Sequence, residues 1–97
     1  MLELIKKIVE AIEKTKKSNM HIYINGEKVL TRKNVTGARL DYNLNCEKVI
    51  YIFNKFDICG EKVESNIAIY ENSGISKLEF ESIENETIEV VNIEQLF

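Results

Sequence analysis

His21 is the only histidine of the chain, and imidazole is the side chain that most often serves as a general base or a metal ligand near neutral pH. A general base needs a carboxylate to orient it and a nucleophile within reach, and a metal site needs further ligands. The surrounding sequence, Met20-His21-Ile22-Tyr23-Ile24, is an alternating strand pattern that supplies neither. We therefore expect a packed or surface histidine, no catalytic residue and a chain that is not an enzyme.

A second motif resembles the start of a calcium-binding loop. Asp41, Asn43 and Asn45 fall at the first, third and fifth positions of such a loop. Cys46 stands where the loop needs glycine, and Ile52 stands where it needs a bidentate glutamate. The four glycines are isolated from one another, so no glycine-rich loop could cradle a phosphate. These patterns predict neither a metal ion nor a cofactor.

The two cysteines, Cys46 and Cys59, match neither a zinc-ligand spacing nor a C-x-x-C redox pair. Reduced thiols are typical of the cytoplasm. The first residues are charged and have a helical pattern, without the basic, apolar and small-residue order of a signal peptide. No apolar run approaches the length of a membrane-spanning helix. We expect a cytoplasmic protein without a membrane segment.

Acidic residues dominate the second half of the chain. Residues 49–97 hold three basic and ten acidic residues, whereas residues 1–48 hold ten basic and six acidic residues. Carboxylates on one surface can imitate phosphates and dock on a basic protein. The candidate residues for this docking face are Glu79, Glu81, Glu84, Glu86 and Glu89. The alternative reading is a solvated edge of a sheet, where charges discourage aggregation.

Basic residues interleaved with tyrosine in the first half suggest a different surface. Lysine and arginine pair with phosphates, and exposed aromatic rings stack on bases. The candidate residues for a nucleic-acid face are Tyr23, Lys28, Arg32, Lys33 and Arg39. The negative net charge of −3 argues against this reading, which we keep as the alternative.

The element predicted first is an amphipathic helix over residues 2–17. Ile5, Ile8 and Ile12 fall at helical spacing, and charged residues occupy the opposite side. Ser18-Asn19 is a plausible helix stop, because asparagine tolerates the left-handed conformation. This pattern predicts a helix that covers a sheet.

A β-hairpin over residues 20–32 follows the helix. Asn25-Gly26 is the dipeptide that a two-residue type I′ turn prefers. Such a turn would place Ile24 opposite Glu27, and Ile22 opposite Val29 on the core side. The following residues 34–37 form a predicted turn, which separates this hairpin from an alternating strand over residues 38–44.

Residues 49–53 are five consecutive apolar residues, β-branched or aromatic, and predict the central strand of the sheet. After Phe56 the pattern loosens, and residues 61–65 suggest a polar connector. Further strands are predicted around residues 67–70, 77–81 and 88–93.

Together these elements predict an α+β fold in a single domain of residues 1–97. The N-terminal helix (residues 1–18) packs on an antiparallel β-meander (residues 20–97) of about five to seven strands, either an open roll or a small barrel. One helix should leave part of the sheet for a second copy of the chain, which predicts a homodimer.

The function we expect is that of a small acidic protein-binding module. Its size, its acidity and its lack of catalytic motifs are typical of inhibitors and regulators encoded by phages or mobile elements, whose partner would be a basic protein. The alternative is a small β-barrel that binds single-stranded nucleic acid.

Overall fold

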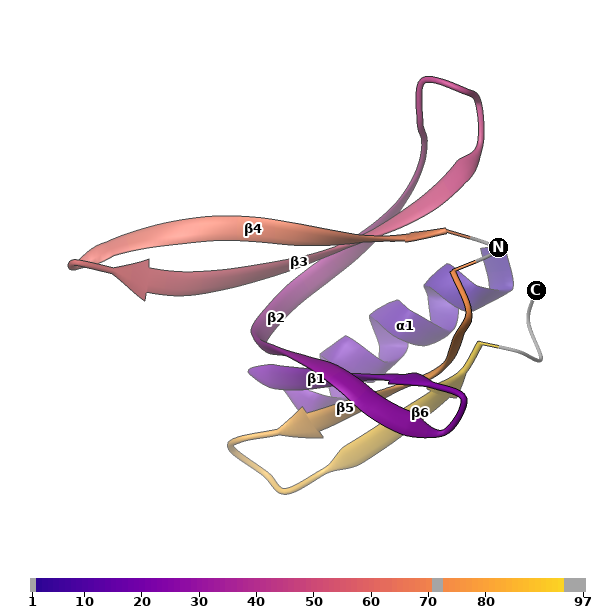
Figure 1. Ribbon diagram of the computed structural model, residues 1–97. Helices are drawn as coiled ribbons and strands as arrows, with labels where there is room; N and C mark the ends of the chain where they lie inside the picture. Colours follow the sequence, from indigo (N-terminus) through magenta and orange to yellow (C-terminus); the bar gives the residue numbers. More distant parts are fainter. Residues whose placement is uncertain (1, 71–72, 94–97) are drawn as a thin grey trace.

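The computed structural model describes residues 2–70 and 73–93, which form one helix and six strands. The elements are α1 (Leu2–Thr15), β1 (Ser18–Ile24), β2 (Glu27–Tyr42), β3 (Lys48–Ile58), β4 (Glu61–Tyr70), β5 (Ile75–Ser82) and β6 (Ile88–Asn92). The strands form one antiparallel sheet in the order β4-β3-β2-β1-β5-β6 (Figure 1). The predicted α+β fold is confirmed, and the sheet is open, with β4 and β6 at its edges.

Helix α1 covers one face of the sheet with its apolar side. Its buried residues Leu4, Ile8 and Ile12 repeat every four positions, which places them on one side of the helix. The helix ends at Thr15, two residues earlier than predicted. Lys16 and Lys17 take the left-handed conformation, with φ of 38° and 50°, so lysines end the helix where the asparagine signal was expected to do so.

The β1–β2 hairpin has the predicted turn and a different register. Asn25 and Gly26 both have positive φ, and Ile24 faces Glu27, as a type I′ turn requires. A register shift follows, so that Ile22 faces Leu30 and the prediction for Val29 is wrong. Val29 is the extra residue of a β-bulge, and its side chain is 52% exposed.

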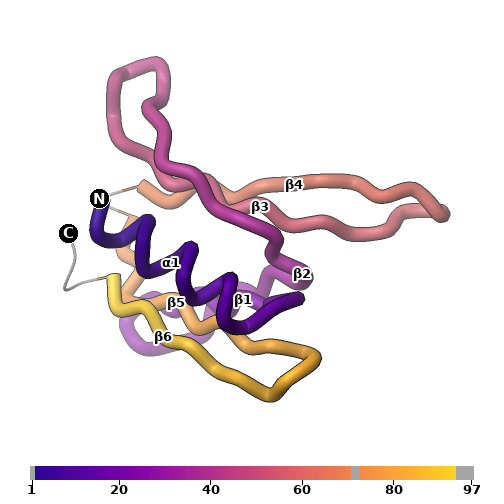
Figure 2. The backbone as a smooth tube through the Cα atoms, turned by 180° about the vertical axis from the view of Figure 1, so that it is seen from behind, coloured from indigo at the N-terminus to yellow at the C-terminus, as the bar shows by residue number. Residues whose placement is uncertain are grey.

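Strand β2 runs without interruption through the turn predicted at residues 34–37. Its first part pairs with β1, and its second part, from Val35 onward, pairs with β3. Asn34 has a φ of 56°, and the β2–β3 register shifts between Val35 and Gly37. These irregularities bend the strand without reversing it. The bend folds the sheet around α1, as Figures 1 and 2 show from opposite sides.

Strands β3 and β4 form a long regular hairpin, so the loosening and the polar connector predicted after Phe56 are wrong. Cys59 and Gly60, with φ of 50° and 83°, make a two-residue turn between Ile58 and Glu61. The outer part of this hairpin, residues 55–64, is called the arm below; in Figures 1 and 2 it projects beyond the helix. Strand β3 lies next to the edge strand β4, so it is not the central strand.

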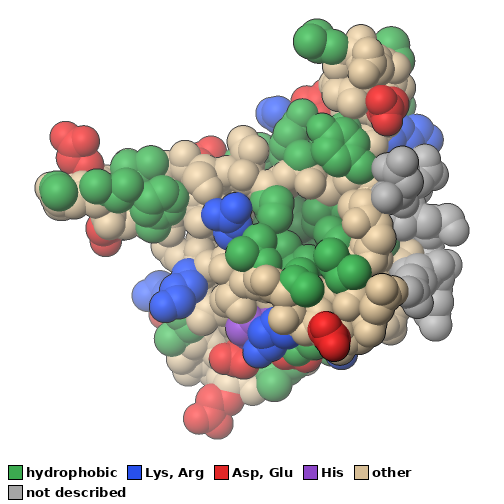
Figure 3. Space-filling model, viewed as in Figure 1, with side chains coloured by type: hydrophobic (Ala, Val, Ile, Leu, Met, Phe, Trp, Pro, Cys, Tyr) green, Lys and Arg blue, Asp and Glu red, His purple; other side chains and the backbone are tan. Residues whose placement is uncertain are grey.

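The hydrophobic core lies between α1 and the face of the sheet that turns toward it. Its largest fully buried side chain is Phe80 of β5, and Met20, Ile50 and Ile69 are fully buried from three other strands. Hydrophobic side chains also gather in a hollow at the centre of the view in Figure 3 and along the projecting arm. No helix in the described part of the chain has the length and apolar character needed to cross a membrane.

Candidate functional site

The outer face of the sheet, turned away from α1, carries polar side chains from β1 and β5. Met20 and Ile22 point into the core, so the alternation of the strand places His21 between them on the outer face. Strand pairing sets His21 directly opposite Glu79 of β5 and opposite Thr31 of β2. The next row of this face places Asn19 opposite Glu81.

His21 lies in a small polar cluster with two carboxylates. Its Nδ1 is 2.8 Å from the hydroxyl oxygen of Thr31, and its Nε2 is 3.8 Å from Oε2 of Glu81. The candidate ligand atoms of His21, Glu79 and Glu81 all lie within 4.8 Å of one another. One imidazole and two carboxylates could hold a divalent cation, although structural zinc sites use four protein ligands. The absence of a metal site stays a prediction.

The sequence does not predict this cluster, because it shows His21 without a carboxylate nearby in the chain. The two glutamates are distant in the sequence, and only the pairing of β1 with β5 brings them together. No local motif marks such a pairing. A periodic pattern identifies a strand but does not show with which other strand it pairs.

The five glutamates of the predicted acidic face lie in three different places. Glu79 and Glu81 lie on the outer face of β5, and Glu86 lies in the turn between β5 and β6. Glu84, in the same turn, forms an ion pair with Lys17. Glu89 pairs with the buried Phe80 and therefore lies on the helix side of the sheet, where it lines a groove of about 240 Å³ between α1 and β6.

Apolar side chains of β6 stand directly beside the two outer glutamates. The strand register places Glu79 opposite Val90 and Glu81 opposite Ile88. Val90 is 46% exposed and Ile88 is 56% exposed, on the side of the sheet that α1 does not cover. We call these four residues the β5–β6 surface. It combines exposed apolar area with two carboxylates on paired strands.

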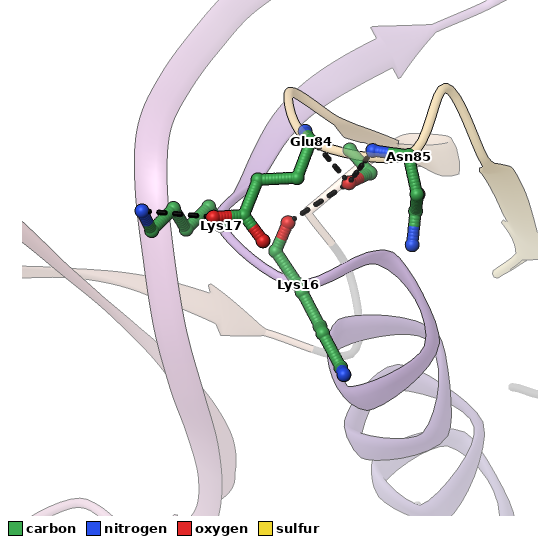
Figure 4. Close-up of polar contacts among 5 residues, drawn as sticks. Lys16, Lys17, Glu84 and Asn85 are labelled. Atoms are coloured by element: carbon green, nitrogen blue, oxygen red, sulfur yellow. Dashed lines mark hydrogen bonds and ion pairs between the residues drawn. The ribbon is translucent and has the colours of Figure 1, made fainter.

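Glu84 and Lys17 connect the β5–β6 turn to the end of the helix. Their side chains point toward one another in Figure 4, with 2.9 Å between Oε1 of Glu84 and Nζ of Lys17. The hydrogen bond from Lys17, and then its charge, lower the pKa of Glu84. The same hydrogen bond raises the pKa of Lys17. This ion pair occupies the carboxylate of Glu84.

The predicted nucleic-acid residues lie in several places on the sheet. Tyr23 and Lys28 are paired on the outer face, where the ammonium of Lys77 lies 4.3 Å from the centre of the Tyr23 ring. Arg32 is paired with Met20 and so belongs to the helix side. Its Nε is buried without a hydrogen-bond partner among the described residues. Lys33 is exposed next to it.

Arg39 lies beyond the bend of β2, on the part of the sheet that pairs with β3. Its guanidinium is 3.2 Å from a carboxylate oxygen of Asp41 and 5.7 Å from the centre of the Phe53 ring. Arg39 is therefore already engaged by an acid and an aromatic ring. Arg39 is paired with Tyr51 of β3, whereas Tyr23 and Lys28 are paired with each other in the β1–β2 hairpin.

The residues that resemble a calcium loop form hydrogen bonds within the loop between β2 and β3. The side-chain oxygen of Asn43 accepts backbone N–H hydrogen bonds from Asn45 and Glu47, each at 2.9 Å. Asp41 accepts the backbone N–H of Tyr42 at 2.8 Å. These bonds give the side chains of Asp41 and Asn43 a role in turn structure.

Comparisons of the chain with protein-family models, with curated proteins and with solved structures give no match.

Proposed function

We propose that the chain is a small non-enzymatic protein-binding module that docks a basic partner on the β5–β6 surface. The observation that carries the proposal is the position of exposed Ile88 and Val90 directly beside Glu81 and Glu79. Apolar area contributes affinity when a partner removes it from water, and nearby carboxylates select a partner that carries lysine or arginine at matching positions.

The position of this surface supports binding without a large loss of conformational freedom. Strand β5 is held between β1 and β6, and its buried residues Leu78 and Phe80 fix it against the core. The backbone that carries Glu79 and Glu81 is therefore already ordered before a partner arrives, which lowers the entropy cost of association. A rigid acidic surface of this kind suits an inhibitor or regulator, and we keep a phage or mobile-element origin as part of the proposal.

Two further features belong to the same proposal. Cys46 and Cys59 are free and exposed, which favours a reducing compartment, and we place the protein in the cytoplasm. Binding of single-stranded nucleic acid has weaker support, because Arg32 and Arg39 lie on different parts of the sheet and Arg39 is engaged by Asp41. We also expect self-association, through a different part of the sheet.

The test compares a surface variant with a matched control. The variant Glu79→Lys/Glu81→Lys reverses the two charges of the β5–β6 surface. The control Glu3→Lys/Glu13→Lys makes the same change in net charge at exposed positions of α1. Tagged proteins are used to capture partners from lysate with and without nuclease, and the partner of the wild type is then purified for titration at several salt concentrations.

We expect a basic protein that binds both the wild type and the control. Its binding should be unaffected by nuclease and should weaken as salt screens the charges. Equal binding by the surface variant would contradict the proposal. Recovery of nucleic acid would instead favour the alternative. In that case Arg32→Glu/Arg39→Glu should abolish retention on an oligonucleotide column.

A further inference from the structure

Strand β4 forms an exposed edge of the sheet. It pairs with β3 on one side in an unbroken register of ten residues, from Val49 opposite Tyr70 to Ile58 opposite Glu61, and the described sheet ends there. The chain contains no proline that could block the edge. An edge strand with free backbone N–H and C=O groups is a template for pairing with another strand.

The arm carries apolar side chains beyond the reach of the helix. Phe56 is paired with Val63 on the helix side of the sheet, and Phe56 remains 40% exposed. Ile58, on the same side of the arm, is also exposed. Figure 3 shows hydrophobic side chains along the projecting arm. A further strand paired at the β4 edge would place a side chain directly beside Val63, in the row that Val63 forms with Phe56.

The opposite side of the arm carries alternating charges. Strand pairing places Lys55 opposite Glu64 and Asp57 opposite Lys62. All four side chains are exposed. Each cross-strand pair is therefore positive with negative, and the sign reverses from one row to the next.

We propose that a second copy of the chain pairs its β4 antiparallel with this β4, across a two-fold axis at Val63. Val63 then faces the partner's Val63, and Lys62 faces the partner's Glu64. The apolar row becomes Phe56, Val63, the partner's Val63 and the partner's Phe56. The charged row becomes Lys55, Glu64, the partner's Lys62 and the partner's Asp57, so its signs alternate across four strands.

Charge complementarity selects this register over its neighbours. If the axis lay at Glu64, that carboxylate would face its own copy, and like charges directly opposite are unfavourable. If the axis lay at Ser65, Lys62 would face Ala68 and Glu64 would face Asn66, which leaves both charges unpaired. All three axes keep the two helices on the same side of the joined sheet, but only the axis at Val63 pairs both charges.

The overlap is confined to residues 61–65 near the tips of the arms, so the bodies of the two copies extend away from one another. An interface of this size belongs to the small class of protein contacts, and we expect a dimer that dissociates on dilution. The proposal does not depend on the β5–β6 surface. Loss of the dimer would leave binding of a basic partner untouched.

The experiment uses two single variants and their mixture, followed by sedimentation over a range of concentrations. Lys62→Glu leaves a glutamate at both positions 62 and 64 of each copy, and Glu64→Lys leaves a lysine at both. Each variant alone therefore sets like charges opposite one another across the axis. We expect each variant to raise the dimer dissociation constant by about tenfold or more. An equal mixture should regain the dimer, because positions 62 and 64 of one variant then face the opposite charge at positions 64 and 62 of the other variant across the axis.

The matched controls are Lys6→Glu and Glu13→Lys on exposed positions of α1, which change the net charge equally and should dimerise as the wild type does. A cysteine placed at the axis tests the register. In a Cys46→Ser/Cys59→Ser background, Val63→Cys should form an intermolecular disulfide and Asn66→Cys should not. A monomeric wild type, a dimer unaffected by Lys62→Glu, or cross-linking at residue 66 in place of 63 would overturn the proposal.

Discussion

The hydroxyl of Ser82 donates a hydrogen bond to the backbone carbonyl of Lys16 over 3.0 Å, and this bond joins the end of β5 to the end of the helix. The same oxygen accepts hydrogen bonds from the backbone N–H groups of Glu84 and Asn85, each at 3.2 Å. Ser82 is buried. One small side chain therefore satisfies three backbone groups at the place where the helix meets the β5–β6 turn.

Replacing Ser82 with alanine should destabilise the protein by about 1–3 kcal/mol, because backbone groups near a buried position lose their partner. Urea denaturation followed by circular dichroism would measure this change. Thr36→Ala is the control: it removes an exposed hydroxyl that donates one long hydrogen bond, of 3.4 Å, to the carbonyl oxygen of Phe53, and we expect a change within about 0.5 kcal/mol. If the two substitutions lowered the free energy of unfolding equally, the hydrogen bonds of Ser82 would not contribute the stability that we expect.

Replacing Lys16 with glycine should stabilise the protein by up to about 1 kcal/mol. Lys16 has a φ of 38°, and a side chain in this region costs about 1–2 kcal/mol, which glycine avoids while losing some entropy on folding. Lys14→Gly is the matched control inside α1, where it should destabilise the helix by about 1 kcal/mol. The two thermal unfolding midpoints should move in opposite directions, and a shared direction would contradict the assignment of Lys16 to the helix end.

The contribution of Glu84 to stability should depend on pH. Its pKa is lowered by the hydrogen bond and the charge of Lys17, so the contribution is present above the unfolded-state pKa and is lost as pH falls through the folded-state pKa. The raised pKa of Lys17 has the opposite sign: its contribution is present below the unfolded-state pKa and is lost in strongly alkaline solution, as pH rises through the folded-state pKa.

Thermal unfolding of the wild type and of Glu84→Gln, from neutral pH down to about pH 3, would measure this dependence. The difference between them should be small, because both side chains are exposed, and it should vanish at acid pH and in high salt. Lys17→Met should remove the same pH dependence, and the double variant should add nothing further. A difference that grows on acidification would contradict the sign.

The sequence predicted those elements whose signal is local. Asn25-Gly26 was recognised because both residues favour positive φ, and this identified the first hairpin. The turn Cys59-Gly60 has the same geometry, but cysteine does not favour the left-handed region, so the sequence carries no comparable signal for the β3–β4 hairpin and the prediction of a loose segment there is wrong. At Asn34 the sequence predicts a turn, but this left-handed residue bends β2 without reversing it.

The candidate site was harder to predict because its parts come from strands that are distant in the sequence. His21, Glu79 and Glu81 meet through the pairing of β1 with β5, and alternation alone does not say which strands are neighbours. The acidic residues lie on different faces of the sheet because of the strand register, which the sequence does not show either. Glu89 and Glu81 are both strand residues in an acidic segment, but the register places them on opposite faces of the sheet.

The turn at the tip of the arm gives a prediction that links stability to the proposed dimer. Cys59 has a φ of 50° and precedes Gly60, so asparagine at position 59 would recreate the preferred Asn-Gly pair. Cys59→Asn should stabilise the hairpin by roughly 1 kcal/mol, because asparagine enters the left-handed region at lower cost than cysteine. The reciprocal substitution Asn25→Cys, at the equivalent position of the β1–β2 turn, should destabilise the protein by a similar amount.

Urea denaturation would measure both changes in stability. Sedimentation of Cys59→Asn should still show the dimer, since Val63 and its charged neighbours lie outside the turn. If Cys59→Asn destabilised the protein, the two-residue turn at residues 59–60 would be wrong, and so would the register of the arm on which the dimer depends.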